Sequence, residues 1–204
     1  MPALALEPSV FPANLLSDVG RTVNGRRWWV MYTKSRQEKA LMRTLGAQAV
    51  PHYLPLVAQQ HLVRGRAITS YQPVFPSYVF VYGDALEREQ CLKTNRVCHV
   101  LPVPNGPELC EDLCRVQTMI ESGCPLTVES RLEPGRWVRV RSGPLEGLEG
   151  CILQRKRQTR LIVAVRMLQQ GVSVEINDYL VEPVTAPVWF NLSSGLLGPT
   201  PLNA

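Results

Sequence analysis

The sequence contains no long hydrophobic run, so a membrane-spanning helix is not part of the expected architecture. No stretch approaches the roughly 20 consecutive apolar residues that a bilayer crossing requires. The first twenty residues also lack a basic segment, and prolines at positions 2, 8 and 12 interrupt any hydrophobic helix there. A secretory signal is therefore not expected. We expect a cytoplasmic protein that has no membrane partner.

The sequence also lacks the residue patterns of a catalytic site. Its three histidines, His52, His61 and His99, are scattered along the chain. No glycine-rich phosphate loop, paired-carboxylate motif or recognisable nucleophile accompanies them, and catalysis needs titratable groups that converge. A hydrolase built on Cys91 and His99 is the enzymatic alternative, and no other motif supports it. We expect no enzymatic activity, no catalytic residue and no cofactor.

Closely spaced pairs of metal ligands are missing as well. The chain has six cysteines, which are expected as thiols in a reducing compartment. Cys110 and Cys114 lie four residues apart in a segment with helical apolar spacing, and no CxxC pair is present. Structural zinc sites usually bring two tight ligand pairs. Small apolar packing residues are therefore favoured over a zinc site, and we expect no bound metal.

The composition is that of an ordinary globular protein with a mild positive charge. With 204 residues and 45% hydrophobic content, the chain is long enough for two modest cores. A net charge of +5 suits a protein that works beside nucleic acid, although it does not establish direct binding. We expect a two-domain monomer.

The first half of the chain alternates strand and helix patterns. Residues 1–25 are rich in turn-forming residues and are predicted to be a flexible arm. Residues 26–106 then read as an α+β domain, with helices packed on a mostly antiparallel sheet. Its predicted elements are strands at 28–32, 53–57, 74–82 and 97–103, helices at 35–45 and 84–92, and a hairpin whose tip is Arg64-Gly65-Arg66. Ser35 with Glu38, and Asp84 with Glu87, have the spacing of helix capping boxes.

The second half changes to a strict period of two. Residues 107–133 are predicted as a short helix followed by a polar linker, and residues 134–184 as a small SH3-like β-barrel. Five short strands in about 50 residues favour closure, because closure removes exposed edges. Residues 185–204 contain three prolines and little charge, and we predict a disordered tail.

Two motifs resemble one known family. The frame from Pro134 through Gly143, Pro144 and Gly147 to Gly150 resembles the KOW motif. Independently, the segments Trp28-Trp29-Val30 and Phe75-Pro76-Ser77-Tyr78-Val79-Phe80-Val81 resemble the N-terminal domain of the NusG family, and Tyr53 to Tyr78 is closer to RfaH-like paralogues. The resemblance implies a factor for transcription elongation and antitermination. The alternative is a ribosome-associated KOW protein that binds RNA, against which the aromatic first domain argues.

The resemblance implies a surface for RNA polymerase on the first domain. In the family this domain offers a hydrophobic depression to the clamp coiled coil of the largest polymerase subunit. The candidates carried over by motif are Tyr32, Phe75, Pro76, Tyr78 and Phe80. Aromatic residues on a sheet face are also typical of a plain core. Tyr78 is the preferred member, because its hydroxyl tolerates a wet rim.

The resemblance also implies contacts with nucleic acid. The candidates for the non-template DNA strand are Lys34, Gln48, Arg64 and Arg66, and the alternative for each is a solvated basic face. Where RfaH has a His-Thr-Thr run that contacts the polymerase gate loop, this chain has Glu89-Gln90-Cys91 and departs from the pattern of that second contact.

The barrel is expected to recruit a partner, either Rho or a small-subunit ribosomal protein. Three of its apolar residues, Val163, Val165 and Ile176, are candidates for either exposed or buried positions. The cluster Arg155-Lys156-Arg157 with Arg160 is predicted at a hairpin tip, where it either contacts RNA or solubilises the turn. The clean alternation favours a barrel, and no switch to a helical fold is assigned.

Overall fold

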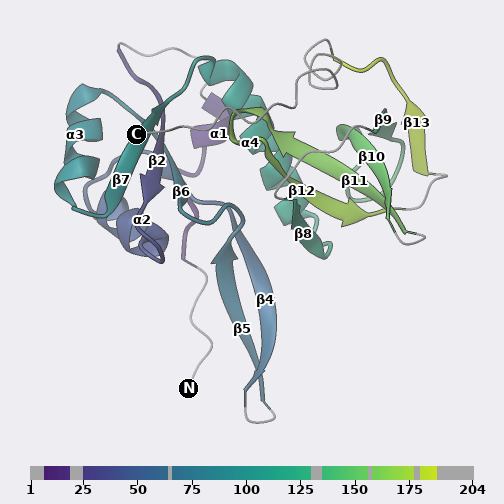
Figure 1. The fold of residues 1–204 in the computed structure, drawn as a ribbon, viewed down its shortest axis with the longest axis horizontal. Helices are drawn as coiled ribbons and strands as arrows, with labels where there is room; N and C mark the ends of the chain where they lie inside the picture. Colours follow the sequence, from purple (N-terminus) through teal and green to yellow (C-terminus); the bar gives the residue numbers. More distant parts are fainter. Residues whose placement is uncertain are drawn as a thin grey trace, which may run out of the picture.

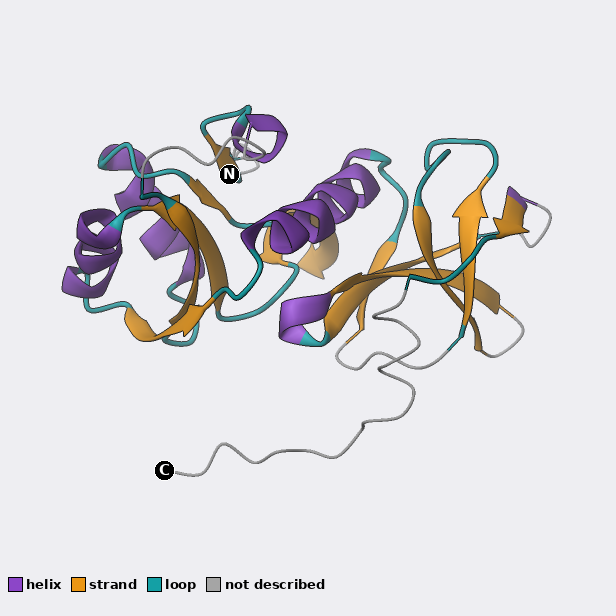
Figure 2. Cartoon of the chain, turned by 90° about the horizontal axis from the view of Figure 1, so that it is seen from above, coloured by secondary structure: helices purple, strands orange, loops and turns teal. Residues whose placement is uncertain are grey.

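The computed structural model describes residues 7–18, 25–63, 66–129, 135–155, 158–176 and 180–187. Two β-sheets lie on either side of a long helix, α4 (Gly106–Glu121), as Figures 1 and 2 show. None of the helices within these ranges is both long and apolar enough to cross a membrane.

The first sheet has the strand order β1-β3-β6-β2-β7, and its neighbouring strands are all antiparallel. Two central strands, β2 (Arg27–Thr33) and β6 (Tyr78–Gly83), pair over most of their length, with Val30 opposite Phe80. The outer strands are β1 (Val10–Phe11), β3 (His52–Tyr53) and β7 (Val97–Pro102).

Both faces of the central strands are buried because helices cover each of them. One face presents Trp29, Met31, Val79 and Val81 to a core that also contains residues of α2 (Glu38–Ala47) and Cys91 of α3 (Ala85–Lys93). The other face contributes to a second core with α1 (Leu15–Asp18) and α4. The predicted packing of helices on a mostly antiparallel sheet therefore involves both faces of this sheet.

The two predicted capping boxes have different outcomes. At α3 the box is present, because the Asp84 carboxylate accepts from the amides of Leu86 and Glu87 and the Glu87 carboxylate accepts from the Asp84 amide. At α2 the prediction is wrong: the helix begins after Gln37 without a side-chain cap. Glu38 instead accepts a 2.7 Å hydrogen bond from the amide of Ser77, which ties α2 to the start of β6.

A long hairpin extends from the first domain and pairs with no other described strand. Strand β4 (Leu56–Val63) pairs with β5 (Arg66–Pro73) in continuous register, from Leu56 opposite Pro73 to Val63 opposite Arg66. Figure 1 shows it projecting away from both sheets. The predicted hairpin is present, while Arg64 and Gly65 of its predicted tip lie outside the described residues.

The predicted flexible arm is partly wrong. Residues 7–18 form β1 and α1, and β1 pairs with β3 through Val10 opposite Tyr53. Arg43 donates two hydrogen bonds, of 2.6 and 2.8 Å, to the carboxylate of Glu7. Leu15 is buried in the core beside α4. The turn-rich composition of this segment concealed an edge strand of only two residues.

The second sheet has the strand order β13-β9-β10-β11-β12-β8. Its strands are β8 (Leu126–Glu129), β9 (Arg136–Val140), β10 (Glu149–Arg155), β11 (Gln158–Val165), β12 (Gln170–Glu175) and β13 (Val181–Pro183). A short 3₁₀ helix, η1 (Arg166–Leu168), joins β11 to β12. The predicted fold class is confirmed: a mixed α+β sheet domain is followed by a β-rich unit that fits a small KOW-like barrel.

One strand of this unit comes from the segment that was predicted as a linker. Residues 126–129 form β8, which pairs with β12 through Val128 opposite Val172. The polar composition misled the prediction because β8 is an edge strand, and Val128 is 40% exposed. Only residues 122–125 separate the end of α4 from β8.

A buried histidine predicts a pH dependence of stability. His52 is 2% exposed, and its Nδ1 lies 2.8 Å from the Val50 carbonyl. Burial lowers the pKa of His52 below its ordinary value of 6.5, so the folded state disfavours the imidazolium. The stability from the neutral ring is present above pH 6.5 and is lost as the pH falls from there toward the lower folded pKa.

We therefore expect the midpoint of urea unfolding to decrease between pH 7.5 and pH 5.5, and the decrease to be reduced in His52→Gln. The exposed His99 provides the control, and His99→Ala should retain the full decrease. An equal pH dependence in the wild type and in His52→Gln would contradict the assignment.

Candidate functional site

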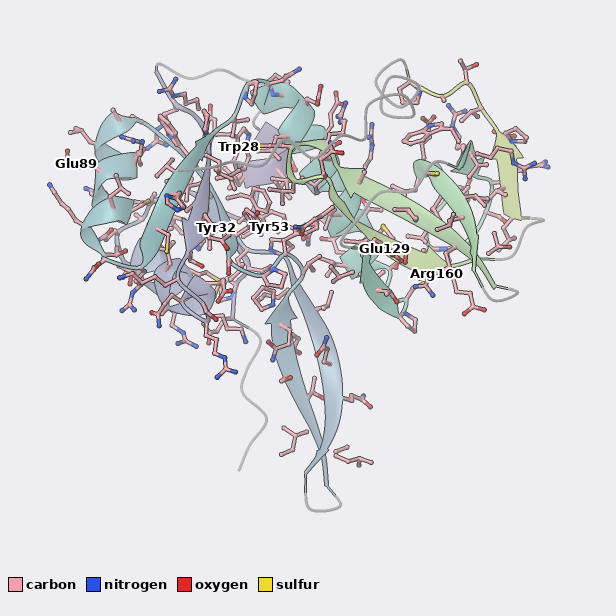
Figure 3. The ribbon with its side chains drawn as sticks, viewed as in Figure 1. Trp28, Tyr32, Tyr53, Glu89, Glu129 and Arg160 are labelled. Atoms are coloured by element: carbon pink, nitrogen blue, oxygen red, sulfur yellow. The ribbon has the colours of Figure 1, made fainter. Side chains whose placement is uncertain are left out.

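An aromatic surface lies at one end of the first sheet. Tyr32 of β2 pairs in register with Tyr78 of β6 on one side and with His99 of β7 on the other. The rings of Tyr32 and Tyr78 meet edge to face with centroids 5.3 Å apart, while His99 stacks on Tyr32 at 6.1 Å. Tyr32 is 37% exposed, His99 is exposed and Tyr78 is half-buried. We call these three residues the aromatic patch, and Figure 3 shows Tyr32 within it.

The patch is accessible because the helices on this face cover only the rest of the sheet. Trp28 and Tyr53 are buried in the core that includes α4, and the Tyr53 hydroxyl donates a 2.7 Å hydrogen bond to Gln117 of that helix. Trp28 and Tyr32 both belong to β2, and Figure 3 shows them one above the other with Tyr53 of β3 beside Tyr32. The same face of the first sheet thus has one part that is buried in the core with α4 and another part, the aromatic patch, that is accessible to solvent.

Two of the five predicted polymerase-binding residues are not available to a partner. Phe75 and Phe80 are fully buried, with ring centroids 6.3 Å apart in an edge-on contact, and Phe80 also lies beside Tyr53. Their predicted direct contact with a partner is therefore wrong. Tyr32 and Tyr78 remain accessible, and Pro76 is exposed two residues before Tyr78. Phe75 and Phe80 instead form the core beneath this part of the sheet.

Sequence reasoning missed His99 as a neighbour of the predicted tyrosines. The sequence suggested His99 only as part of the hydrolase alternative. The available signal was the alternation of β7, which puts His99 on the same face as Leu101, together with the pairing of β7 to β2. The neighbouring strand, and hence the contact with Tyr32, was not evident from local sequence.

Burial affects the ionisation of one member of the patch, Tyr78. Partial burial raises the pKa of Tyr78, and the neighbouring Tyr32 raises it further. The phenol of Tyr78 therefore stays protonated at neutral pH and remains able to donate a hydrogen bond. The patch offers two phenol rings and one imidazole, a combination suited to a partner surface that is apolar in its centre and polar at its rim.

The predicted nucleic-acid residues do not form one cluster. Lys34 is exposed immediately beyond β2, where its Nζ donates a 3.0 Å hydrogen bond to Asn95. Lys34 precedes the start of α2, whereas Gln48 is the C-cap residue at the end of that helix. The two ends of the ten-residue helix are about 15 Å apart. Arg64 lies outside the described residues, and Arg66 is at the far end of the hairpin, where its side chain is not placed.

A groove beside Pro76 contains basic side chains that the sequence did not single out. It has a volume of about 740 Å³ and lies between the start of α2, the base of the hairpin and Val128 of β8. Arg36 and Lys39 line it together with Ser35 and Ser77. Both cations follow Lys34 closely in the chain, and the Glu38 carboxylate lines the groove with them.

The residues of the KOW motif serve different structural purposes. Gly143 and Gly147 lie in the turn between β9 and β10 with φ of 94° and 81°, and the Gly147 amide donates to the Val140 carbonyl. Gly150 lies within β10, where an added Cβ would be 2.5 Å from the Ile162 carbonyl oxygen of β11. Pro144 is exposed in the turn. All four have a structural explanation.

The members of the predicted basic cluster, Arg155-Lys156-Arg157 with Arg160, do not share one outcome. Arg160 is not free for RNA: its Nε donates to the Ser173 hydroxyl at 2.9 Å, and a terminal nitrogen donates to the Thr127 hydroxyl at 2.6 Å. Ser173 in turn donates to the buried Glu129, and Figure 3 shows Glu129 and Arg160 close together. Residues 156 and 157 lie outside the described part of the chain.

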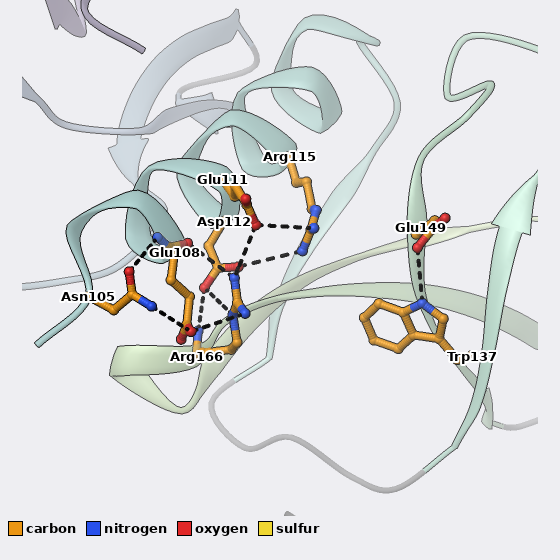
Figure 4. A network of polar contacts seen from close by, with 8 residues as sticks. All are labelled: Asn105, Glu108, Glu111, Asp112, Arg115, Trp137, Glu149 and Arg166. Atoms are coloured by element: carbon orange, nitrogen blue, oxygen red, sulfur yellow. Dashed lines mark hydrogen bonds and ion pairs between the residues drawn. The ribbon is translucent and has the colours of Figure 1, made fainter. Parts of the chain in front are cut away.

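A second polar network joins α4 to the second unit. Nε of Arg166 lies 3.0 Å from both carboxylate oxygens of Asp112, and the Arg166 amide donates to the same carboxylate at 2.9 Å. A terminal nitrogen of Arg166 also donates to the backbone carbonyl of Glu108 (Figure 4). Figure 4 also shows a separate hydrogen bond, from the Trp137 indole to the Glu149 carboxylate. Burial raises the pKa of Asp112, and its hydrogen bonds with Arg166 oppose that shift.

The structure shows how far the cysteines and the three apolar candidates of the second unit are buried. The thiols of Cys110 and Cys114 both face the Leu16 carbonyl, and no group of three metal-ligating residues occurs in the described ranges. Cys91 is buried in α3, with a pKa that burial raises to about 11. Val163 and Val165 are buried, while Ile176 is half-buried.

Comparison with known proteins identifies the first domain. Residues 26–111 match the family model described as "Transcription termination factor nusG", a span that includes the first sheet from β2 onward and the beginning of α4. A solved structure, "Crystal Structure of MjSpt4:Spt5 complex conformation B", is similar at 16% identity over 78% of this chain and 97% of that chain. Its TM-score is 0.28, which is too low to support an inference about function.

Proposed function

Because the chain belongs to the NusG family by the match over residues 26–111, we propose that it binds RNA polymerase through the aromatic patch and suppresses pausing or termination. The family places it among transcription elongation factors. In this proposal the second unit recruits a further partner, either Rho or a small-subunit ribosomal protein. The resemblance of its motifs to RfaH-like paralogues favours antitermination over termination.

The observation that supports polymerase binding is the open end of the first sheet. Tyr32 is the one exposed Phe, Tyr or Trp among the described residues, and Tyr78 and His99 contact its ring on either side. A pre-ordered cluster of aromatic rings loses little conformational entropy on binding, which is why such residues dominate interface energetics. The clamp coiled coil of the largest polymerase subunit is the partner that this surface fits in the family.

Nucleic-acid contact is proposed for the cationic side chains next to the patch. Lys34 is two residues from Tyr32, and Arg36 and Lys39 line the groove beside Pro76. A polymerase bound at the patch would bring the non-template DNA strand near them, where they would contact phosphates without reading sequence. Arg64 and Arg66 at the end of the hairpin are proposed as a separate contact.

Polymerase binding is tested by replacing one ring of the patch. We expect Tyr78→Ala to weaken polymerase affinity by roughly 1–4 kcal/mol, the range for truncating an aromatic anchor. Binding is measured with purified core polymerase, and single-round transcription reports pause lifetime and readthrough. Tyr71→Ala is the matched control, because Tyr71 is a half-buried tyrosine of β5 outside the patch. Unchanged affinity of a folded Tyr78→Ala protein would remove the patch from the polymerase interface.

A ribosome-associated KOW protein is the alternative function. The family match over the first domain favours the polymerase, because a KOW unit alone does not account for residues 26–111. Copurification separates the two: association with polymerase supports the proposal, whereas stoichiometric retention on ribosomes stripped of polymerase supports the alternative.

A further inference from the structure

We propose that the buried Asp112–Arg166 pair locks the second unit onto α4, so that both domains move as one body and the adjoining face of β11 is withheld from partners. The lock itself is independent of the polymerase. Only its consequence for recruitment rests on the proposed function, in which the second unit engages a partner.

The first support is the geometry of the pair. The Asp112 side chain is 1% exposed, and it accepts from the Nε and the backbone amide of Arg166. Hydrogen bonds between charged groups in a fork geometry are short, strong and specific in direction. Removing one member leaves the other with longer ion pairs, Arg166 with Glu108 at 3.4 Å and Glu111 at 3.7 Å, or Asp112 with Arg115 at 3.6 Å. Loss of the closest partner of a largely buried charge is unfavourable. The pair therefore specifies one position of η1 against α4.

The second support is that α4 belongs to two cores. Gln117 accepts a hydrogen bond from Tyr53 of the first sheet, whereas Asp112 accepts from the second unit. Five residues along a helix correspond to a rotation of about 140°, so these contacts lie on different sides of α4. A single hydrophobic cluster runs from Trp28 through Leu113 to Val163 and Val165. A helix that served only one domain would bury a narrower stripe.

The third support is the short connection between α4 and the second sheet. Residues 122–125 span at most about 14 Å even when fully extended. Strand β8 follows immediately and is held in the sheet by β12. Covalent and non-covalent links thus restrict the same movement. Relative domain motion is the usual expectation for two domains in one chain, and this interface opposes it.

The consequence concerns two residues of the second unit that the sequence left open between exposed and buried positions. Val163 and Val165 are buried in the cluster that includes α4, and β11 lies against that helix. While the lock is closed, a partner of the second unit must use a different surface of it. Opening the lock would expose this apolar face.

The lock is tested on the full chain by ¹⁵N relaxation, which reports how fast each domain tumbles. In the wild type, amides of β2 and β6 should have the same rotational correlation time as those of β9 and β10. In Asp112→Asn, the correlation time of the second unit should fall about two-fold, because the tumbling body becomes roughly half as large. Unequal times in the wild type, or equal times in a folded Asp112→Asn protein, would overturn the proposal.

Matched variants isolate the buried pair. Glu111→Gln is the control, because Glu111 is an exposed acidic neighbour 3.7 Å from Arg166, and it should leave the correlation times unchanged. Arg166→Gln tests the same contact from η1 if Asp112→Asn does not fold, and it should also separate the two times. Equal times in Arg166→Gln would count against the lock.

Exposure of the withheld face is measured separately with a soluble paramagnetic gadolinium chelate. Relaxation enhancement at the Val163 and Val165 methyls should be low in the wild type and rise several-fold in Asp112→Asn. Methyls that stay protected while the domains tumble separately would refute the withheld face. Neither readout uses polymerase, so both stand if the proposed function fails.

Discussion

Replacing Phe80 by alanine is expected to lower the free energy of unfolding by about 3–5 kcal/mol, the range for removing a buried phenylalanine ring. Phe80 is fully buried in the middle of β6 and contacts the rings of Phe75 and Tyr53. Its loss would remove apolar contacts and leave a cavity between the sheet and α4, where backbone hydrogen bonds on both sides of β6 limit any collapse.

The measurement is urea unfolding of the full chain followed by tryptophan fluorescence. Tyr78→Ala, two residues along the same strand, is the comparison, because Tyr78 is half-buried and should contribute only about 1 kcal/mol through its contact with Tyr32. The two variants thus separate stability from binding: Phe80→Ala should unfold the domain more easily, and Tyr78→Ala should mainly weaken polymerase binding. Equal losses of stability in the two variants would contradict the assignment of Phe80 to the core and of Tyr78 to the accessible patch.

Replacing Gly150 by alanine is expected to destabilise the second unit by about 3 kcal/mol, at the upper end of the range for overpacking. The added Cβ would lie 2.5 Å from the Ile162 carbonyl oxygen and 3.0 Å from Cδ1 of Leu161. The oxygen belongs to the backbone of the paired strand, so relief requires β10 and β11 to move apart. The loss of β9 to β12 amide signals with urea measures the effect.

Gly143→Ala is the contrasting variant for the same motif. No atom lies within 4 Å of the position that its Cβ would take, and the only obstacle is a φ of 94°. Adopting left-handed backbone angles costs an ordinary residue about 1–2 kcal/mol. Gly150→Ala should therefore be the more destabilising of the two. A larger loss of stability in Gly143→Ala would mean that the positive φ of the turn, and not the close contact between β10 and β11, is the main reason for glycine in this motif.

The architecture of each sheet was predictable because it depends on local alternation. The segment from Val74 to Tyr82 and the period-two run after Pro134 indicate their strands directly. Strands β1 and β8 were missed for a common reason. Each is short, lies at an edge and gains its order from one neighbour, β3 or β12, that is distant in sequence. Edge pairing leaves little trace in composition.

The candidate site was predictable in chemical type but not in accessibility. Alternation places Tyr78 and Phe80 on one face of β6, and it gives no reason to treat them differently. What separates them is where α4 ends its coverage of the sheet, a tertiary fact decided by contacts such as Tyr53 with Gln117. The same helix hides Val163 and Val165, and its contact with Arg166 depends on residues 54 positions apart.

The unsupported hairpin has a length that can be changed in defined steps. Eight paired residues at about 3.3 Å each extend it about 26 Å beyond its base. Because side chains alternate, deleting two consecutive pairs, such as Gln59 and Gln60 with Thr69 and Ser70, would shorten it by about 7 Å and keep every remaining side chain on its original face. Deleting a single pair would turn the distal part over. The length of the hairpin can thus be changed in steps of two residue pairs without moving any remaining side chain to the other face.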